Sequence, residues 1–417
     1  MDRTILHVDC NKFYASVECA FRPSLKNVPV VVGGDEELRH GVVLTKNEIA
    51  EKYGIKTGEP LVGARRKCKD LVVLKPNFPL YKEVSRQVRE IFLRYTDMVE
   101  PFGLDEAWLD VTGSYHLFGD GVAIAESIRN AVKNELGITV SIGVSFNKVF
   151  AKLGSDYKKP DAVTVFSREN YKELVWPIKA GDMLFVGKST VKKLESYGIY
   201  TIGDISRSDD EFIKSKFGKQ GEVLLRFARG EDESPVKNAD DKEEYKSVGN
   251  SMTTPRDMTC YEDVCVVMSY LADTVASRLR KHSLKGKTVC ISVRDNKLVS
   301  FTRQGKLSNY SCISDEILDK ALELFRENYS WASPIRSVGI SVTDFPQDDE
   351  AEQMDFFSVS DEKREKKEKL EETIDSLRMR FGKNCICKAR SASDNTLILK
   401  KSENHSKFYK TNFHSKS

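Results

Sequence analysis

Three acidic residues end or interrupt apolar segments, where carboxylates can bind divalent cations. Asp9 follows the apolar run 5–8, and Asp105 and Glu106 are adjacent within the strand-like segment 99–111. Burying three like charges together is prohibitive unless cations compensate them. Two Mg²⁺ ions could do so, one activating an attacking oxygen and the other stabilising the leaving phosphates of an in-line displacement. Taken alone, the Asp-Glu pair would more often be a solvated hairpin tip, so its context has to decide.

The segments around these acids predict an α+β block. Short β-branched runs between turn residues predict strands, and apolar residues at helical spacing predict amphipathic helices. Segment 99–111 predicts a hairpin with the two acids at its tip. Further strands are predicted at 5–8, 29–34, 42–44, 139–144 and 163–166, and helices at 13–17, 46–53, 81–95, 122–136 and 148–157.

Two further units follow this block. From residue 167 onward, glycines separate short helical segments, which predicts an all-α unit. The polar segment 238–246 predicts an exposed linker, and a small α/β sandwich and a late helix follow. The predicted elements are helices 262–280, 314–329 and 361–380, strands 288–293, 298–301 and 337–342, and a disordered tail from residue 402.

The composition excludes several classes of protein. The 417 residues are 40% hydrophobic and 31% charged, which fits folded domains and not a disordered chain. No apolar window is long enough for a membrane span and the start does not resemble a signal peptide, so we expect a cytosolic protein. The nine cysteines lack the spacing of a zinc site or a disulfide framework. The formal charge of +3 is too balanced to indicate nucleic acid by itself.

Three motifs together resemble one family. Residues 7–18 read HVDCNKFYASVE, residues 104–111 read LDEAWLDV, and residues 143–160 run from GVSFNKVF to YKKP. Over roughly residues 1–345 the chain resembles Y-family DNA polymerases, nearest the DinB or polymerase IV branch. The resemblance implies an α+β multidomain fold like a right hand, with palm, small fingers, a helix-hairpin-helix thumb and an α/β little finger. The implied divisions are palm 1–18 and 76–166, fingers 19–75, thumb 167–236, linker 237–246, little finger 247–346 and C-terminal tail 347–417.

The resemblance also assigns roles to the acids and to one aromatic residue. It implies that two Mg²⁺ ions bind to Asp9, Asp105, Glu106 and the backbone carbonyl of Cys10, with Glu106 and Asp105 as the catalytic residues. Tyr14 falls at the steric gate, the ring that presses against C2′ of the incoming sugar and excludes a 2′-hydroxyl. Alternatively, Tyr14 is an ordinary core aromatic near a helix start, although its hydroxyl would then need a partner.

The contacts to the triphosphate match the family only in part. Lys159 corresponds to the family's lysine at the incoming triphosphate, and a compact ammonium group suits that charge. In the fingers helix the family commonly has a Tyr and, three residues later, an Arg, where this chain has Glu48 and Glu51. Two acids cannot hold a triphosphate. Lys46 or Lys52 could replace them, or nucleotide affinity could be weak.

Two regions predict contacts with primer-template DNA. Residues 185–190 resemble a helix-hairpin-helix in which Gly187 and Lys188 would face a phosphate, although Phe185 stands where the family has Gly. Between 278 and 306 nine basic residues face one acid, which predicts salt-sensitive binding to the DNA backbone. A solvated sheet face is the alternative. The predicted basic contacts are Arg278, Arg280, Lys281, Lys285, Lys287, Arg294, Lys297 and Arg303.

A short motif beyond the third unit predicts a protein partner. Residues 353–357, QMDFF, are similar to the pentapeptide with which bacterial polymerases bind the sliding clamp, the beta clamp. Gln353 would anchor the peptide through its amide, and Met354, Phe356 and Phe357 would enter a hydrophobic groove. We therefore expect the chain to bind the clamp. Separately, we expect the chain to be a monomer.

The sequence thus predicts a template-directed DNA polymerase of low fidelity that extends primers past damaged bases. The primer 3′-hydroxyl would attack the α-phosphate of a dNTP and release pyrophosphate. Two alternatives stay open at this point. The chain could be a catalytically weak accessory factor bound to the clamp and to DNA, or a two-metal nuclease.

Overall fold

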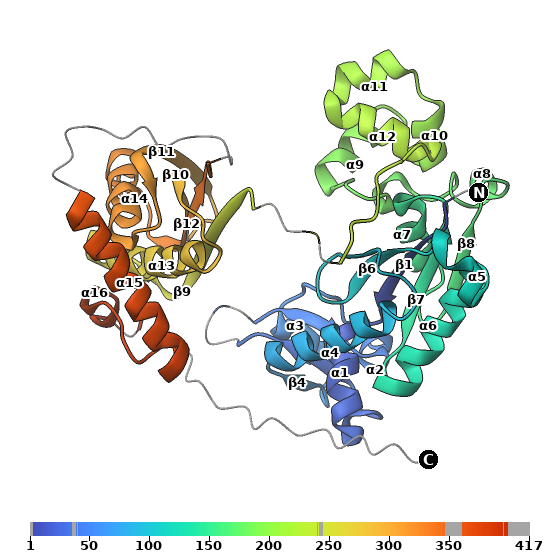
Figure 1. Ribbon diagram of the computed structural model, residues 1–417, viewed down its shortest axis with the longest axis horizontal. Helices are drawn as coiled ribbons and strands as arrows, with labels where there is room; N and C mark the ends of the chain where they lie inside the picture. Colours follow the sequence, from blue (N-terminus) through green and yellow to red (C-terminus); the bar gives the residue numbers. More distant parts are fainter. Residues whose placement is uncertain are drawn as a thin grey trace. The chain divides into compact units, whose positions relative to one another are not determined.

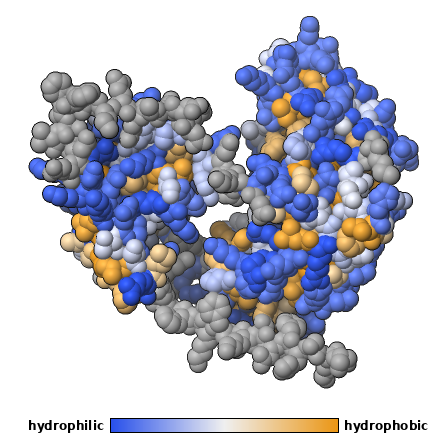
Figure 2. All heavy atoms as spheres, in the orientation of Figure 1, coloured by the Kyte–Doolittle hydropathy of each residue, from blue (hydrophilic) through white to orange (hydrophobic). Residues whose placement is uncertain are grey.

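The computed structural model describes residues 3–35, 39, 41–239, 241, 245–346, 361–394 and 396–398. The chain forms two compact units, one of Met1–Glu36 with His40–Lys242 and one of Glu37–Arg39 with Glu243–Ser417 (Figure 1). The visible surface of each unit is mainly hydrophilic, with hydrophobic residues in small groups (Figure 2). None of the described helices combines the length and the apolar character that a membrane span requires.

A five-stranded sheet forms the centre of the first unit (Figure 1). Its elements are β1 Ile5–Cys10, β5 Val99–Pro101, β6 Glu106–Asp110, β7 Val140–Ser145 and β8 Val163–Phe166, with helices α1 Phe13–Phe21, α4 Phe78–Phe92, α5 Tyr115–Phe118, α6 Gly121–Leu136 and α7 Lys148–Tyr157. The strand order is β5-β6-β1-β7-β8, and β1 is antiparallel to both β6 and β7. Leu6 and Val8 share a core with α4 and α6, so the alternate residues His7 and Asp9 face α7. The predicted hairpin 99–111 is confirmed.

A smaller sheet of the same unit has the order β3-β2-β4. Its elements are β2 Val30–Gly33, β3 Val43–Lys46 and β4 Val72–Leu74, with helices α2 Glu48–Lys52 and α3 Leu61–Lys67. The helix predicted at 46–53 begins two residues later. Asn47 is its N-cap, because the Asn47 side chain accepts a hydrogen bond from the amide of Ala50. Lys46 consequently belongs to strand β3.

Short helices follow β8, as predicted. They are α8 Tyr171–Leu174, α9 Lys188–Glu195, α10 Ile202–Arg207, α11 Asp210–Phe217 and α12 Lys219–Arg229. Their apolar residues share a core with Phe150 of α7 and Phe166 of β8, which joins this helical part to the five-stranded sheet.

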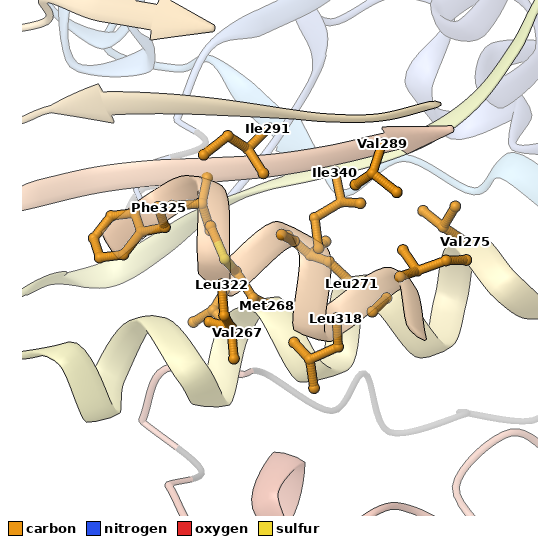
Figure 3. Packing of buried hydrophobic residues seen from close by; sticks show 14 of the residues in the cluster. Val267, Met268, Leu271, Val275, Val289, Ile291, Leu318, Leu322, Phe325 and Ile340 are labelled. Atoms are coloured by element: carbon orange, nitrogen blue, oxygen red, sulfur yellow. The ribbon is translucent and has the colours of Figure 1, made fainter. Parts of the chain in front are cut away.

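The second unit is a four-stranded antiparallel sheet with helices on one face. Its elements are β9 Ser247–Met258, β10 Gly286–Asp295, β11 Ser300–Ser311 and β12 Ile335–Thr343, with helices α13 Tyr261–Lys281 and α14 Ser314–Asn328. The order is β11-β10-β12-β9. Figure 3 shows how Val289, Ile291 and Ile340 of the sheet pack on Leu271 and Phe325 of the helices. Both predicted helices are confirmed, whereas β9 was not predicted and β11 is longer than the predicted 298–301, because neither shows a regular apolar alternation.

The late helix predicted at 361–380 is confirmed as α15 Asp361–Phe381, and α16 Ala389–Ala392 follows it. Both belong to the second unit and contact α13, and Leu397 and Ile398 are buried in the core of that unit. Parts of the predicted linker, the predicted disordered tail, and the predicted clamp motif with Gln353, Met354, Phe356 and Phe357 lie outside the described residues.

Candidate active site

Asp9 and Glu106 lie directly opposite each other on neighbouring strands. The antiparallel register of β1 and β6 pairs Asp9 with Glu106, and the amide of Cys10 donates a hydrogen bond to the carbonyl of Asp105 at 2.9 Å. Residues paired in this way point to the same face, with Cβ atoms about 5 Å apart. The pairing of β1 with β6 thus brings together acids that are far apart in the sequence, which confirms the predicted convergence.

Two glycines allow helix α7 to lie directly on this sheet. A Cβ on Gly143 of β7 would be 2.6 Å from the amide nitrogen of Ser155, and a Cβ on Gly154 would be 2.9 Å from the Cα of Gly143. Because neither residue has a side chain, the backbone of α7 can approach β7 closely. This contact brings Lys152 of α7 to the face that carries the acids.

Two lysines lie against the acids. Lys159 Nζ is 2.8 Å from Asp9 Oδ2 and 2.7 Å from Asp156 Oδ1. Lys152 Nζ forms an ion pair with Glu106. The lysine predicted for the triphosphate thus lies beside one predicted metal ligand. Lys152, for which we predicted no role, lies beside another.

His7 is buried next to Glu106. Its Nδ1 is 2.8 Å from Ser155 Oγ, and its Nε2 is 3.2 Å from Glu106 Oε2 without a well-formed hydrogen bond to any described residue. Burial lowers the pKa of His7 to about 4, so the ring is neutral at pH 7. His7 therefore adds no charge beside Glu106.

Burial also governs the protonation of the acids. Burial raises the pKa of Asp9 to about 6, against the opposing charge of Lys159. Burial raises the pKa of Asp105 too, and the charge of Glu106 acts in the same direction. For Glu106, burial is outweighed by contacts with His7 and Lys152, and the pKa falls to about 2. The environment of Asp9 and Asp105 therefore favours additional positive charge.

The donor atoms at this site suit Mg²⁺. Asp9, Asp105, Glu106 and the Cys10 carbonyl supply oxygen ligands, which this hard cation prefers. Among the described residues, no three carboxylate, His or Cys side chains are grouped closely enough to hold a metal ion, and the ammonium groups of the two lysines face two of the acids. The strand pairing places these acids on adjacent strands, and in this structure the lysines provide the positive charge that burial requires.

Tyr14 lies on α1 near the acids. Its ring stacks on Tyr81 with centroids 4.5 Å apart and meets Phe78 edge-on at 5.9 Å. Burial, and then the negative charge of Asp105, raises the pKa of the Tyr14 hydroxyl. Tyr81 is itself anchored, because its hydroxyl donates to the buried carboxylate of Glu18 at 2.7 Å. An aromatic platform thus supports a half-buried ring beside the acids.

The two acids of helix α2 have different surroundings. Glu48 is exposed, whereas Glu51 forms ion pairs with Lys12 at 2.7 Å and with Lys46 at 3.2 Å. Lys52 is exposed on the same helix. The structure therefore favours Lys46 over Lys52 as a candidate replacement, and it adds Lys12, which the sequence analysis missed.

Known proteins resemble this chain along most of its length. Residues 8–156 match the impB/mucB/samB family, residues 245–356 match the C-terminal domain of that family, and residues 182–232 match the DNA polymerase-iota thumb domain. DNA polymerase IV of Acetivibrio thermocellus is 50% identical over 382 residues, which cover 92% of this chain and 96% of that protein. The chain belongs to the DinB-like branch of the Y-family DNA polymerases.

Other comparisons agree with this placement. DNA polymerase IV 1 of Bacillus subtilis strain 168 is 34% identical over 406 residues, which cover 97% of this chain and 95% of that protein. A solved Y-family DNA polymerase chimera of Dbh and Dpo4 has the same fold, with a TM-score of 0.73 and 22% identity over 82% of this chain and 99% of that one. This Y-family member is thus a DNA-directed DNA polymerase of the translesion type, with primer-template DNA and dNTPs as substrates.

The expected right-hand fold of the polymerase is confirmed. The five-stranded sheet corresponds to the palm, the three-stranded sheet to the fingers, the short helices to the thumb, and the four-stranded sheet with α13 and α14 to the little finger. The boundaries between these parts stay predictions.

In the thumb hairpin of the polymerase, Phe185 adopts a backbone conformation that glycine usually adopts. This residue has a φ of 66°, in the left-handed region that favours glycine, and its side chain is exposed. Gly187 is the N-cap of α9, and Lys188 is the first residue of that helix. The departure from the family's Gly therefore leaves Gly187 and Lys188 at the helix start.

The little-finger face opposite α13 and α14 is lined by small polar residues. Along β10, Val289, Ile291 and Val293 face the helices, so Arg294 lies on the other face. The residues that the strand register places on the same face as Arg294 are Ser251, Thr253, Cys290, Ser292, Ser300, Thr302, Gln304, Lys306, Ser337, Gly339 and Ser341. Most of these side chains are small, and small side chains let another backbone approach closely.

Arg280 does not fit the predicted DNA contact. Its side chain is only 7% exposed and forms ion pairs with Glu371 and, at 2.7 Å, with Asp375, both on α15. Its guanidinium also donates to the carbonyl of Cys312. The prediction failed because the sequence does not reveal that α15 packs against α13. We therefore remove Arg280 from the predicted DNA contacts.

The other predicted basic contacts have varied surroundings. Arg303 donates to Asn328 of α14 and so lies on the helical side of the sheet. Lys285 forms an ion pair with Glu368 at 3.0 Å, and Arg278 donates to a backbone carbonyl of β9. Exposed or half-exposed side chains occur at Lys281, Lys287, Arg294 and Lys297.

Proposed function

We propose that this polymerase copies damaged templates with low fidelity by a mechanism that uses two Mg²⁺ ions. The register of β1 with β6 carries this proposal, because it gathers the acids at the centre of a polymerase palm. Tyr14 and Lys159 beside these acids support polymerisation over nuclease activity, which needs neither a ring against the sugar nor a cation at a triphosphate. Oxygen ligands in this number suit two hard cations.

The residues of the chain would position the reactants. The metal ligands would be Asp9, Asp105, Glu106 and the Cys10 carbonyl. Bound Mg²⁺ would lower the pKa of the primer 3′-hydroxyl and neutralise the triphosphate. Lys159 would exchange Asp9 for a phosphate oxygen of the nucleotide, and Tyr14 would exclude a 2′-hydroxyl. The 3′-oxygen then attacks the α-phosphate in line, and pyrophosphate leaves.

We also propose where the partners bind. The polar face of the little finger would accept the DNA backbone, assisted by Arg294, with Lys281, Lys287 and Lys297 as further predicted contacts of the little finger, while Gly187 and Lys188 of the thumb would face a phosphate. The QMDFF motif at 353–357 would bind the sliding clamp, and the chain would act as a monomer. The location in the cell, which we expect to be the cytoplasm, also stays a prediction.

Primer extension on undamaged and damaged templates tests the catalytic proposal. We compare wild type with Asp105→Asn and Glu106→Gln, and with Glu90→Gln as a control that neutralises an exposed acid on α4. Each active-site variant should lose dNTP addition by about 100-fold or more, since metal binding is worth several kcal/mol in the transition state. Glu90→Gln should match wild type.

Each other outcome supports an alternative. Strand shortening by wild type would indicate a nuclease. DNA binding without any dNTP addition would indicate an accessory factor. Extension that always stops at a damaged base, or misinsertion as rare as in a replicative polymerase, would contradict the translesion, low-fidelity proposal.

A further inference from the structure

Glu51 of helix α2 joins two lysines that come from separate elements. Its carboxylate is 2.7 Å from Lys12 Nζ and 3.2 Å from Lys46 Nζ. Lys12 immediately precedes α1 and Lys46 ends β3, so three segments of the first unit converge on one carboxylate. The lysine side chains are only 21% and 15% exposed, whereas Glu51 is 50% exposed. Hydrogen bonds from Lys12 and Lys46 lower the pKa of Glu51 against the effect of burial, so the carboxylate is charged at neutral pH.

The position of Lys12 is fixed close to the acids of the palm. Lys12 follows Asp9 by three residues, so their Cα atoms are at most about 11 Å apart. Asn11 lies between them and is held by two hydrogen bonds. Its backbone N–H donates to the Thr139 carbonyl at 2.9 Å, and its side-chain Oδ1 accepts from Ser141 Oγ at 2.9 Å. The chain then turns through a left-handed residue, Lys12 with a φ of 50°, into α1. Two ammonium groups and one carboxylate give this cluster a net charge of +1 (2 − 1).

Each lysine can contact Glu51 and a phosphate at the same time. An ammonium group has three N–H donors, and an ion pair with Glu51 leaves others for a second acceptor. Compact cations with spare donors suit polyphosphate oxygens. We propose that Lys12 and Lys46, positioned by Glu51, bind the triphosphate of the incoming nucleotide. This inference rests on the proposed polymerase function, and it gives Glu51 a role at the position of the fingers helix where the family resemblance predicts an Arg.

Single-nucleotide incorporation tests the two lysines. We compare Lys12→Ala and Lys46→Ala with Lys52→Ala, a matched control that removes an exposed lysine adjacent to Glu51. Losing one hydrogen bond between charged groups should raise the KM for dNTP about 10- to 100-fold in each of the first two variants. Lys52→Ala should keep the wild-type KM. All three variants should bind primer-template DNA with the wild-type Kd, measured by fluorescence anisotropy. Unchanged binding would also show that the variants are folded.

Inorganic tripolyphosphate isolates the triphosphate contact from the base and the sugar. It should compete with dNTP, and its inhibition constant should rise in Lys12→Ala and Lys46→Ala by a factor similar to that of the KM. Glu51→Gln tests the positioning role. Removal of a negative charge alone predicts a lower KM, whereas loss of the anchor for both lysines predicts a KM several-fold higher, which is the result we expect.

The outcomes separate this inference from the proposed function. Wild-type values of KM and of tripolyphosphate inhibition in both lysine variants would overturn the assignment of the lysines. A lower KM in Glu51→Gln would overturn the role of Glu51. Both readouts require wild-type protein that extends primers. If wild type adds no dNTP at all, the proposed function fails instead, and the two failures cannot be confused.

Discussion

Gly143→Ala should show how strongly the active site depends on the packing of α7. The new Cβ would collide with the backbone carbonyl oxygen of Ala151, its nearest neighbour, and would lie 2.6 Å from the amide nitrogen of Ser155. Ordinary contacts begin at 3.4 Å, so the deficit is 0.8 Å (3.4 − 2.6) at Ser155 and larger at Ala151. The obstacle is the helix backbone, which cannot rotate away as a side chain can. Helix α7 must therefore shift by a comparable distance, and overpacking of this kind costs about 1–3 kcal/mol.

The same shift would disturb the chemistry, because α7 carries Lys152 and leads to Lys159. A displacement of about 1 Å can lower a rate about 100-fold. We therefore expect Gly143→Ala to lower both the free energy of unfolding in urea and the kcat of single-nucleotide incorporation. The matched control is Gly63→Ala on α3, where nothing lies within 4 Å of the new Cβ and where alanine should stabilise the helix by about 0.5–1 kcal/mol.

Two results would refute this reasoning. An unchanged urea midpoint together with an unchanged kcat in Gly143→Ala would mean that α7 does not depend on the close approach. An equal loss of stability in Gly63→Ala would mean that the effect has another cause.

Three further predictions concern the sugar gate, the stability of the ring that supports it, and the clamp. Tyr14→Ala should raise ribonucleotide incorporation in primer extension, whereas Tyr81→Phe, which keeps the ring under Tyr14, should leave sugar selection unchanged; equal discrimination in wild type and Tyr14→Ala would reject the gate. In urea, Tyr81→Phe should still lower the free energy of unfolding by about 1.5–3 kcal/mol, because it removes the hydrogen bond to buried Glu18. Deletion of 353–357 should leave distributive synthesis intact and abolish stimulation by the clamp, and equal stimulation of both forms would disprove the motif.

The strands near the acids were predictable because their apolar residues form short runs between turn residues. Strand β1 is a buried run, Ile5–Cys10, that carries Asp9 next to its end, and β5 and β6 have apolar residues on both sides of the acids. Neither pattern gives the register. Sequence spacing alone could not place Asp9 opposite Glu106, and only the family resemblance joined them before the fold did.

The rest could not be predicted because it depends on tertiary pairing of polar residues. Lys152 meets Glu106 only because Gly143 allows α7 to approach the sheet. Lys12 and Glu51 are 39 positions apart (51 − 12), and no local pattern couples them. Local charge counting also misplaced Arg280, because a basic residue pairs with whichever acids the fold brings to it.

Arg280→Ala distinguishes a structural arginine from one that binds DNA. In the structure its removal would leave Glu371 and Asp375 of α15 without their buried cation, a change that costs about 3–5 kcal/mol for a buried pair. Arg294→Ala is the matched control, because Arg294 is exposed on the polar face of the little finger.

We expect opposite effects from the two variants. In urea, Arg280→Ala should lower the free energy of unfolding, and below its melting temperature it should bind primer-template DNA with the wild-type dependence on salt. Arg294→Ala should keep the wild-type stability but weaken DNA binding, and it should reduce the slope of log K against log salt by about 1, the value for one lost phosphate contact. If Arg280→Ala reduced this slope and left the stability unchanged, the burial of Arg280 under α15 would not be its role, and the original assignment to DNA would stand.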